Sequence, residues 1–225
     1  MKKNKTILLL AISGFSQVSF SQGFISVTTG LSLQRSLKKD QRFWAVGQDV
    51  IFNWHYTSRT GLYASVSYYT DGKFNNTLSA TAKLPTTTPQ EISFTNKAEL
   101  RLEQLSLGWR YYLVGAADAE ETWNLYGITG FGLIFGKATN NYSTTIDTSL
   151  YNAPQQPVNG SGHFKRLTLD LGLGWEIPLR ADIFFYAEGK TWIPTTDYPS
   201  KYLFVNDDAP LIVNISAGLR IVINN

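Results

Sequence analysis

The stretch Leu167–Leu179, LTLDLGLGWEIPL, decides the fold because every odd-numbered position in it is apolar. The even positions between them hold polar, charged, glycine or proline residues. The stretch Leu211–Ile223, LIVNISAGLRIVI, repeats this pattern with an apolar residue at all seven of its odd positions. Because successive side chains of a β-strand point to opposite faces, a period of two predicts strands with one apolar face.

The N-terminus has the pattern of a secretory signal peptide. Lys2, Lys3 and Lys5 precede an apolar run from Ile7 to Ile12, and the small residues Ser19 and Ser21 follow. This run is shorter than the roughly 20 residues that a membrane-spanning helix needs. We therefore expect residues 1–21 to be a cleaved leader and residues 22–225 to form one domain that is exported from the cytoplasm.

Charge and cysteine content exclude several classes of protein. Loss of three leader lysines from 20 Lys and Arg leaves 17, which equals the 17 Asp and Glu. A mature chain without net charge gives no reason to expect a nucleic-acid partner. The chain has no cysteine, so we expect neither a disulfide framework nor a lipoprotein anchor.

Alternation along the rest of the chain predicts an all-β fold of eight strands. These are Phe24–Gln34, Asp49–Thr57, Leu62–Thr70, Leu100–Val114, Trp123–Lys137, Phe164–Leu179, Ile183–Ile193 and Leu211–Ile223. The connections between them alternate between long and short. In an antiparallel up-and-down barrel this order places the four long connections at one end and the three short turns at the other, as in transmembrane β-barrels.

A set of aromatic residues falls near the short-turn end of these strands. We interpret them as an interfacial girdle, which membrane proteins place at the level of the lipid headgroups. The predicted girdle is Trp54, Tyr56, Trp109, Tyr111, Trp123 and Trp175.

Periodicity alone does not say whether the apolar face meets lipid outside or a ligand inside, so a soluble lipocalin-like barrel is the alternative. Small residues on the polar set, such as Gly30, Gly108 and Gly172, favour lipid outside, because a narrow barrel interior has little room. The apolar parity changes after Leu102, for which we expect a bulge near Glu103 and Gln104, or a strand that extends beyond the lipid.

The leader, the eight strands and the last strand around Asn214–Ile221 resemble the small eight-stranded outer-membrane β-barrels of Gram-negative bacteria, of the OmpA/OmpX type or the PorT-like barrel domains. The resemblance covers the whole expected mature chain. It implies a cell-envelope protein of the outer membrane that contacts lipid, and whose long loops are available to envelope protein partners. Many such barrels end on an aromatic residue, whereas this chain ends on Ile223, Asn224 and Asn225.

Charged residues of the polar set should project into the interior of such a barrel. The predicted charge network is Arg110, Asp170, Glu176, Glu188, Lys190 and Arg220. Opposite charges in a narrow lumen should pair, since unpaired buried charges are costly. We therefore expect a salt-bridged plug, with a path for ions or solutes as the alternative.

The sequence gives little support for catalysis, and we expect a structural or binding role or an accessory role in an envelope complex. His55 falls on the polar set near a short turn, where we expect a hydrogen-bonded lumen residue. His163 lies near Ser161 and the expected loop residues Asp207 and Asp208, so a surface enzyme acting on lipid or peptide is the alternative. No metal-ligand cluster or cofactor motif is present in the sequence.

Overall fold

The computed structural model describes residues 23–119, 121–152, 158–195 and 211–223. The predicted leader and Asp207 and Asp208 lie outside these residues. No helix in the described ranges has the length and apolar content required to cross a membrane.

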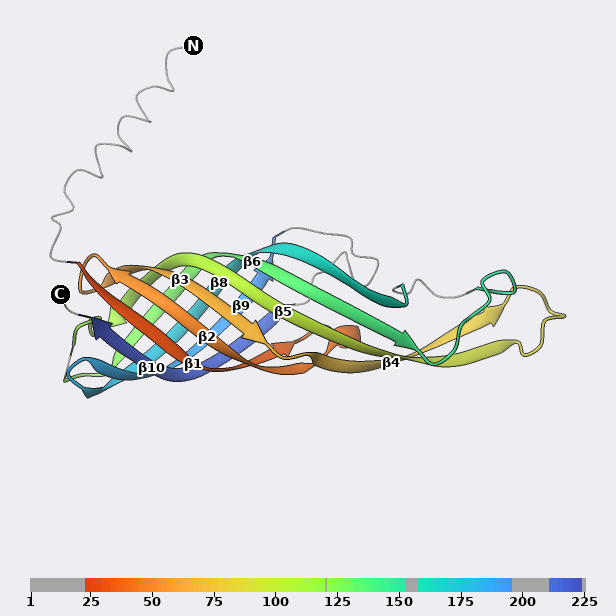
Figure 1. Cartoon of the computed structure of the whole chain (residues 1–225), viewed down its shortest axis with the longest axis horizontal. Helices are drawn as coiled ribbons and strands as arrows, with labels where there is room; N and C mark the ends of the chain where they lie inside the picture. Colours follow the sequence, from red (N-terminus) through yellow and green to blue (C-terminus); the bar gives the residue numbers. More distant parts are fainter. Residues whose placement is uncertain (1–22, 120, 153–157, 196–210, 224–225) are drawn as a thin grey trace, which may run out of the picture.

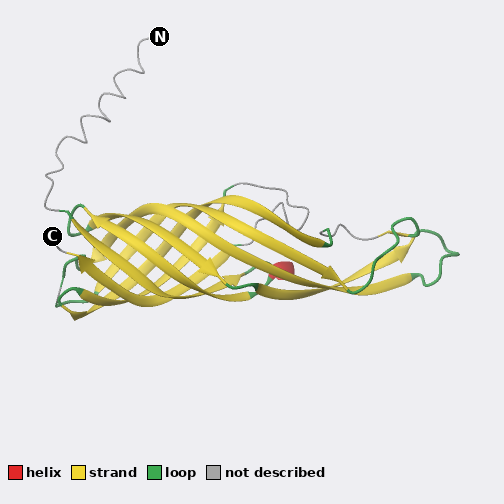
Figure 2. Ribbon diagram, viewed as in Figure 1, coloured by secondary structure: helices red, strands yellow, loops and turns green. Residues whose placement is uncertain are grey.

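Eight of the described strands close into an antiparallel barrel (Figures 1 and 2). They are β1 (Phe24–Ser36), β2 (Trp44–His55), β3 (Thr60–Tyr69), β5 (Glu91–Val114), β6 (Asn124–Tyr142), β8 (Gly160–Arg180), β9 (Ile183–Pro194) and β10 (Ile212–Ile223). Each strand pairs with the next, and β1 pairs with β10 from Ile25 opposite Ile223 to Ser36 opposite Ile212. The predicted fold class is therefore confirmed.

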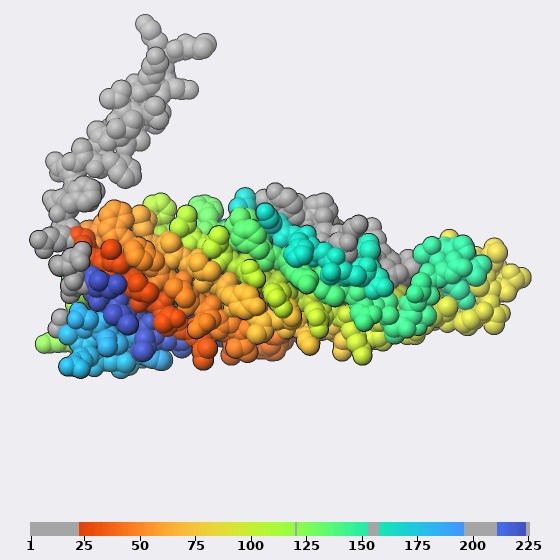
Figure 3. All heavy atoms as spheres, viewed as in Figure 1, coloured from red at the N-terminus to blue at the C-terminus, as the bar shows by residue number. Residues whose placement is uncertain are grey.

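Two further strands lie outside the barrel wall. β4 (Gly72–Ala82) continues the course of β3 and pairs with the first half of β5, and the short β7 (Tyr151–Asn152) pairs with the end of β4. β4 and the first half of β5 form a narrow hairpin that protrudes beyond the barrel, and β7 lies along the end of β4 (Figures 1 and 3). A short 3-10 turn, η1 (Lys39–Gln41), lies between β1 and β2.

The long connection expected between Leu62–Thr70 and Leu100–Val114, residues 71–99, is not a loop. This segment alternates with period two and forms most of the hairpin. β6 and β8 also extend further towards this end than predicted, to Tyr142 and from Gly160.

The apolar face of the barrel points outward. Leu31 is 70% exposed, and Leu107 and Phe131 are each 67% exposed. Leu171 and Ile215 from the two stretches that decide the fold are exposed as well. Because these side chains line the outer wall and not the interior, the lipocalin-like alternative is wrong.

The bulge expected near Glu103 and Gln104 is absent, because β5 keeps its register with β6 from Asn96 to Tyr112. The register shifts only between Tyr112 and Val114. Leu100 and Leu102 have the same inward orientation as Gln104, so the change of parity reflects an apolar layer inside the barrel and not an extra residue.

Glycines make room for aromatic rings in the lumen. A Cβ on Gly174 would overlap the ring of Tyr126, and one on Gly30 would overlap the hydroxyl of Tyr186. The interior of an eight-stranded barrel is just wide enough for side chains to fill, so a ring needs a wall without a side chain. Aromatic rings in the lumen therefore explain why Gly30 and Gly174 have no side chain.

Candidate functional site in the barrel interior

A chain of ion pairs crosses the interior towards the short-turn end. Arg110 of β5 places Nη1 3.2 Å from Oε1 of Glu176 and Nη2 3.3 Å from Oε2 of Glu188. Glu176 also accepts from Arg220 Nη2 at 2.9 Å, and Glu188 pairs with Lys190 Nζ at 2.7 Å. All five side chains are buried, and each carboxylate is shared between two cations.

Aromatic rings enclose these ion pairs. The guanidinium carbon of Arg110 lies 4.1 Å from the ring centroid of Tyr126, and that of Arg220 lies 4.0 Å from the ring centroid of Phe184. The hydroxyl of Tyr112 donates to Glu176 at 3.3 Å. A guanidinium in such a site combines ion pairing with stacking on a π face, which lysine does less well.

Asp170, the sixth residue of the predicted network, lies in the interior but is held by neutral donors. Its carboxylate accepts from Thr168 Oγ1 at 2.7 Å, from Ser106 Oγ at 2.5 Å and from Gln104 Nε2 at 3.0 Å. Hydrogen bonds of this kind offset the cost of burying a carboxylate.

An apolar layer fills the lumen at the opposite end, where the sequence predicted polar contents. Trp192 is only 1% exposed, and its ring centroid lies 5.7 Å from that of Tyr69 in an edge arrangement. The members of this layer are Phe43, Ala45, Tyr69, Leu100, Leu102, Ile134, Ala138, Trp192 and Ile212. From Leu102 to Arg110 the strand advances by about 26 Å, so the two layers are separate.

Two buried charges were absent from the predicted network. Asp49 of β2 and Arg166 of β8 are both buried in the interior. The described interior thus holds four bases and four acids: Arg110, Arg166, Lys190, Arg220, Asp49, Asp170, Glu176 and Glu188. A signal for both was available, since each falls on the polar parity of its strand.

His55 is buried in the lumen, as expected. Its Nε2 lies 2.9 Å from Ser26 Oγ, and its ring stacks on Phe24 with centroids 4.6 Å apart. His163 lies instead on the outer wall of β8, opposite Lys137 of β6. Within the described ranges, no group of three His, Cys, Asp or Glu side chains is arranged to hold a metal ion.

The residues predicted to form the aromatic girdle point outward near the short-turn end. Trp54, Trp109, Tyr111, Trp123 and Trp175 are exposed large side chains. Tyr56 is half-buried and packs edge-on against Trp54, with ring centroids 6.4 Å apart.

Charged side chains lie on the outer wall at its long-loop end, which we call the rim. Arg35 stacks on Trp44 with its guanidinium carbon 4.5 Å from the ring centroid. At the same level Arg101 donates to Asp71 from Nε at 2.8 Å and from Nη2 at 2.9 Å. These hydrogen bonds favour the charged carboxylate and lower the pKa of Asp71 below its usual value.

Comparison with solved structures identifies the architecture. A major outer membrane protein from Thermus thermophilus superposes with a TM-score of 0.53 at 12% identity, over 90% of this chain and 100% of that one. Ail, the attachment invasion locus protein of Yersinia pestis, solved in complex with the heparin analogue sucrose octasulfate, superposes with a TM-score of 0.50 at 13% identity over the same shares.

The chain has the fold of a small outer-membrane β-barrel. No family model matches its sequence. No curated protein matches it either.

Proposed function

We propose that this protein is an integral outer-membrane barrel that does not conduct, and that it presents a rigid hairpin to envelope or extracellular partners. Its role is then structural or binding, including that of an accessory subunit of an envelope complex, and not catalytic. The lipid of the outer membrane and protein partners of the long loops are the expected contacts.

The outer wall supports the membrane location. Exposed Leu, Ile, Val and Phe side chains encircle the barrel between the aromatic girdle and the rim at Arg35 and Arg101. A monomer in water rarely exposes an apolar surface of this extent, whereas a transmembrane barrel requires an apolar band about 25 Å tall. The secretory leader predicted at residues 1–21 agrees with export to the envelope.

The two layers of the interior support a closed lumen, and this observation carries the proposal. Trp192 and its neighbours form an apolar layer at the long-loop end, and the shared ion pairs of Arg110 and Arg220 occupy the short-turn end. An eight-stranded barrel holds side chains and not an aqueous channel, and a conducting pore needs a continuous polar path.

The protruding hairpin supports a binding role. β4 and the first half of β5 pair from Gly72 opposite Leu100 to Thr81 opposite Glu91, so a long, ordered surface extends past the rim. A small apolar cluster around Phe94 and Tyr151 stabilises it. Loops and protrusions held by a rigid scaffold are where barrels carry their function.

Conductance measurements test the proposal. Purified protein inserted into a planar bilayer should show no steady current, because both layers block ions. A variant with Phe43→Ala and Trp192→Ala should remain blocked by the ion pairs, and a further Arg110→Ala change should produce current. Steady current through the unmodified protein, or a protein that stays soluble without detergent, would contradict the proposal.

A further inference from the structure

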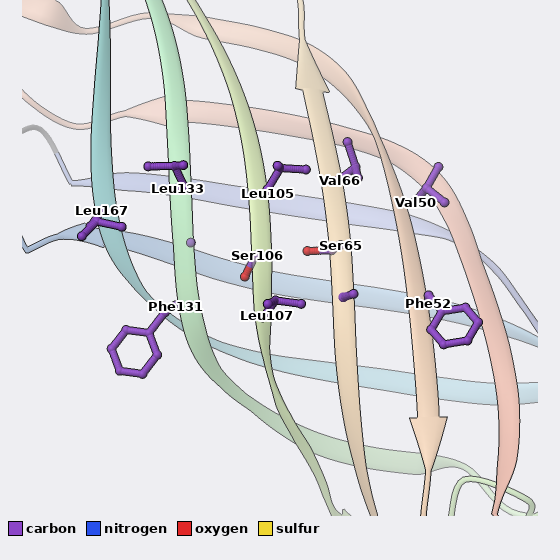
Figure 4. A pocket seen from close by; sticks show the side chains of 12 residues that line it. Val50, Phe52, Ser65, Val66, Leu105, Ser106, Leu107, Phe131, Leu133 and Leu167 are labelled. Atoms are coloured by element: carbon purple, nitrogen blue, oxygen red, sulfur yellow. The ribbon is translucent and has the colours of Figure 1, made fainter.

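An apolar groove of about 550 Å³ crosses the outer face of β2, β3, β5, β6 and β8 (Figure 4). The strand register sets its walls as two rows of outward side chains. The row nearer the long loops is Val50, Val66, Leu105, Leu133 and Leu167, and the other is Phe52, Ala64, Leu107 and Phe131. This volume falls within the range of about 300–1,000 Å³ typical of small-molecule sites.

The groove exists because the wall is thin between the two rows. Ser65, Ser106 and Gly132 lie in register there, and the two serine side chains face the lumen, so their backbone forms the floor. Ala64 is the smallest outward residue in the lower row, between Phe52 and Leu107. The backbone donors and acceptors of the floor are engaged in the sheet, so the groove suits a ligand without polar groups.

The β8 end of the groove lies close to a basic residue. On β8 the upper wall residue Leu167 lies only two positions from Lys165. Because residues along a strand are about 3.3 Å apart, the β8 end of the groove lies within about 7 Å of this lysine backbone.

Cations gather at that end of the groove. Lys137 of β6 lies directly opposite Arg101 of β5, and Lys165 of β8 lies opposite Phe135, two positions from Lys137. The Lys165 ammonium lies 5.4 Å from the ring centroid of Phe135, on the side of β6. Diagonal neighbours on adjacent strands are about 7–8 Å apart, and like charges directly opposite each other are destabilising.

Acidic groups near this cluster lie on the β5 side. Asp71 is paired with Arg101 at 2.8 Å, Glu99 is paired with Lys73 at 3.3 Å, and Glu103 is exposed. Among the described residues, neither Lys137 nor Lys165 forms an ion pair with a carboxylate. The excess positive charge is therefore concentrated between β6 and β8, at the mouth of the groove.

We propose that the groove and these two lysines form one binding site for a lipid with an anionic phosphate headgroup. The phosphate lies between Lys137 and Lys165, and one acyl chain follows the groove from Leu167 towards Val50. The apolar walls match the chain, and the two ammonium groups, which form no ion pair within the described ranges, match the phosphate. This inference rests on the proposed membrane location of the barrel.

Lipid retention by the intact barrel tests the proposal. Detergent-purified protein is mixed with equal amounts of dimyristoyl phosphatidic acid and dimyristoylglycerol, which differ only in the phosphate, and the retained lipid is measured by native mass spectrometry. We expect about a tenfold preference for the phosphatidic acid. Lys137→Gln with Lys165→Gln should remove the preference, and Ala64→Phe should lower retention of both lipids.

Two control variants match these changes elsewhere on the surface. Lys73→Gln with Lys97→Gln removes the same charge from the hairpin, and Ala187→Phe adds the same ring to the outer wall on β9. Both controls should retain lipid as the unmodified protein does. Equal retention of the two lipids, equal loss in the control variants, or a dimer that Ala64→Phe dissociates would each overturn the proposal.

Failure of this inference is separable from failure of the proposed function. A barrel that requires detergent but shows no preference for phosphatidic acid contradicts only the lipid site. A protein that remains soluble without detergent contradicts the membrane location itself.

Discussion

The two halves of β5 have opposite polarity, although they form one continuous strand. From Leu105 to Leu113 the outward residues are apolar and the inward residues include Arg110. From Glu91 to Lys97 the outward residues are polar. Ile92 and Phe94 lie on the other face of the strand, which continues the inner wall of the barrel. Because the backbone geometry is the same in both halves, we attribute the difference to the surroundings, with lipid around Leu105–Leu113 and water around Glu91–Lys97.

The change of polarity along β5 occurs where charged residues lie on the neighbouring strands. Arg101 and Glu103 separate the two halves on β5, and Lys137 and Lys165 occupy the matching positions on β6 and β8. Charged side chains at the membrane midplane are costly, and the cost falls towards the interface. We therefore expect the rim to lie at the outer lipid surface.

We call Leu105–Leu113 the membrane half of β5 and Glu91–Lys97 its hairpin half. The largest expected loss of folding free energy comes from an inward residue of the membrane half. Arg110→Met removes the partner shared by Glu176 and Glu188 and leaves buried negative charge less compensated. Breaking a buried ion pair by removing one partner costs about 3–5 kcal/mol of folding free energy. Urea unfolding in lipid vesicles should show this loss, and Lys97→Met in the hairpin half should leave the midpoint unchanged. Equal midpoints for the two variants would contradict the contrast.

The outer wall of the membrane half should tolerate charge poorly. Leu107→Arg places a guanidinium among acyl chains, at a cost of about 2–4 kcal/mol near the midplane. Ser93→Arg puts the same side chain on the same face of the same strand, but in the hairpin, where water solvates it. Unfolding of both variants in vesicles measures the difference. Similar destabilisation of the two would mean that both halves meet the same solvent.

The hairpin should unfold locally while the barrel stays folded. Phe94→Ala removes the most buried large side chain of its apolar cluster, which includes Ala80 and Tyr151, at a cost of about 1.5–3 kcal/mol. Amide hydrogen exchange in β4 should accelerate, while exchange in β1 and β10 stays slow, because local units open separately. Acceleration in all strands together would show one cooperative unit.

The smallest expected effect lies at the rim itself. The pKa of Asp71 is lowered in the folded state by its hydrogen bonds from Arg101. The pair therefore adds stability above the ordinary aspartate pKa of about 3.9, and this is lost as the pH falls through the lowered value. Because exposed pairs contribute little, Asp71→Asn should shift the unfolding midpoint slightly at pH 7 and not at acidic pH. A shift of the unfolding midpoint that is the same at both pH values would show that it does not come from the charge of Asp71.

The strand pattern made the fold predictable, because alternation over Leu167–Leu179 has no helical interpretation and the long and short connections order the strands. The hairpin was missed because strands were expected only where one face is apolar, as in a membrane. Residues 72–99 alternate as well, but with threonine and asparagine on the face that continues the outer wall.

The interior was predictable in part. Parity alone places Arg110, Glu176 and Arg220 inside, but it cannot say which charges meet, since this depends on strands distant in the sequence. The apolar layer around Trp192 was missed because inward positions were expected to be polar throughout. The groove below Lys165 was missed because it depends on how small residues of three strands align.

Lipid accessibility along β5 tests the central claim most directly. The chain has no cysteine, so single cysteines at odd positions from Glu91 to Leu113 can each carry one environment-sensitive fluorophore. In vesicles whose acyl chains carry bromine as a quencher, we expect strong quenching from Leu105 to Leu113 and little from Glu91 to Arg101. Quenching that is uniform along the strand, or strongest in the hairpin half, would contradict the account.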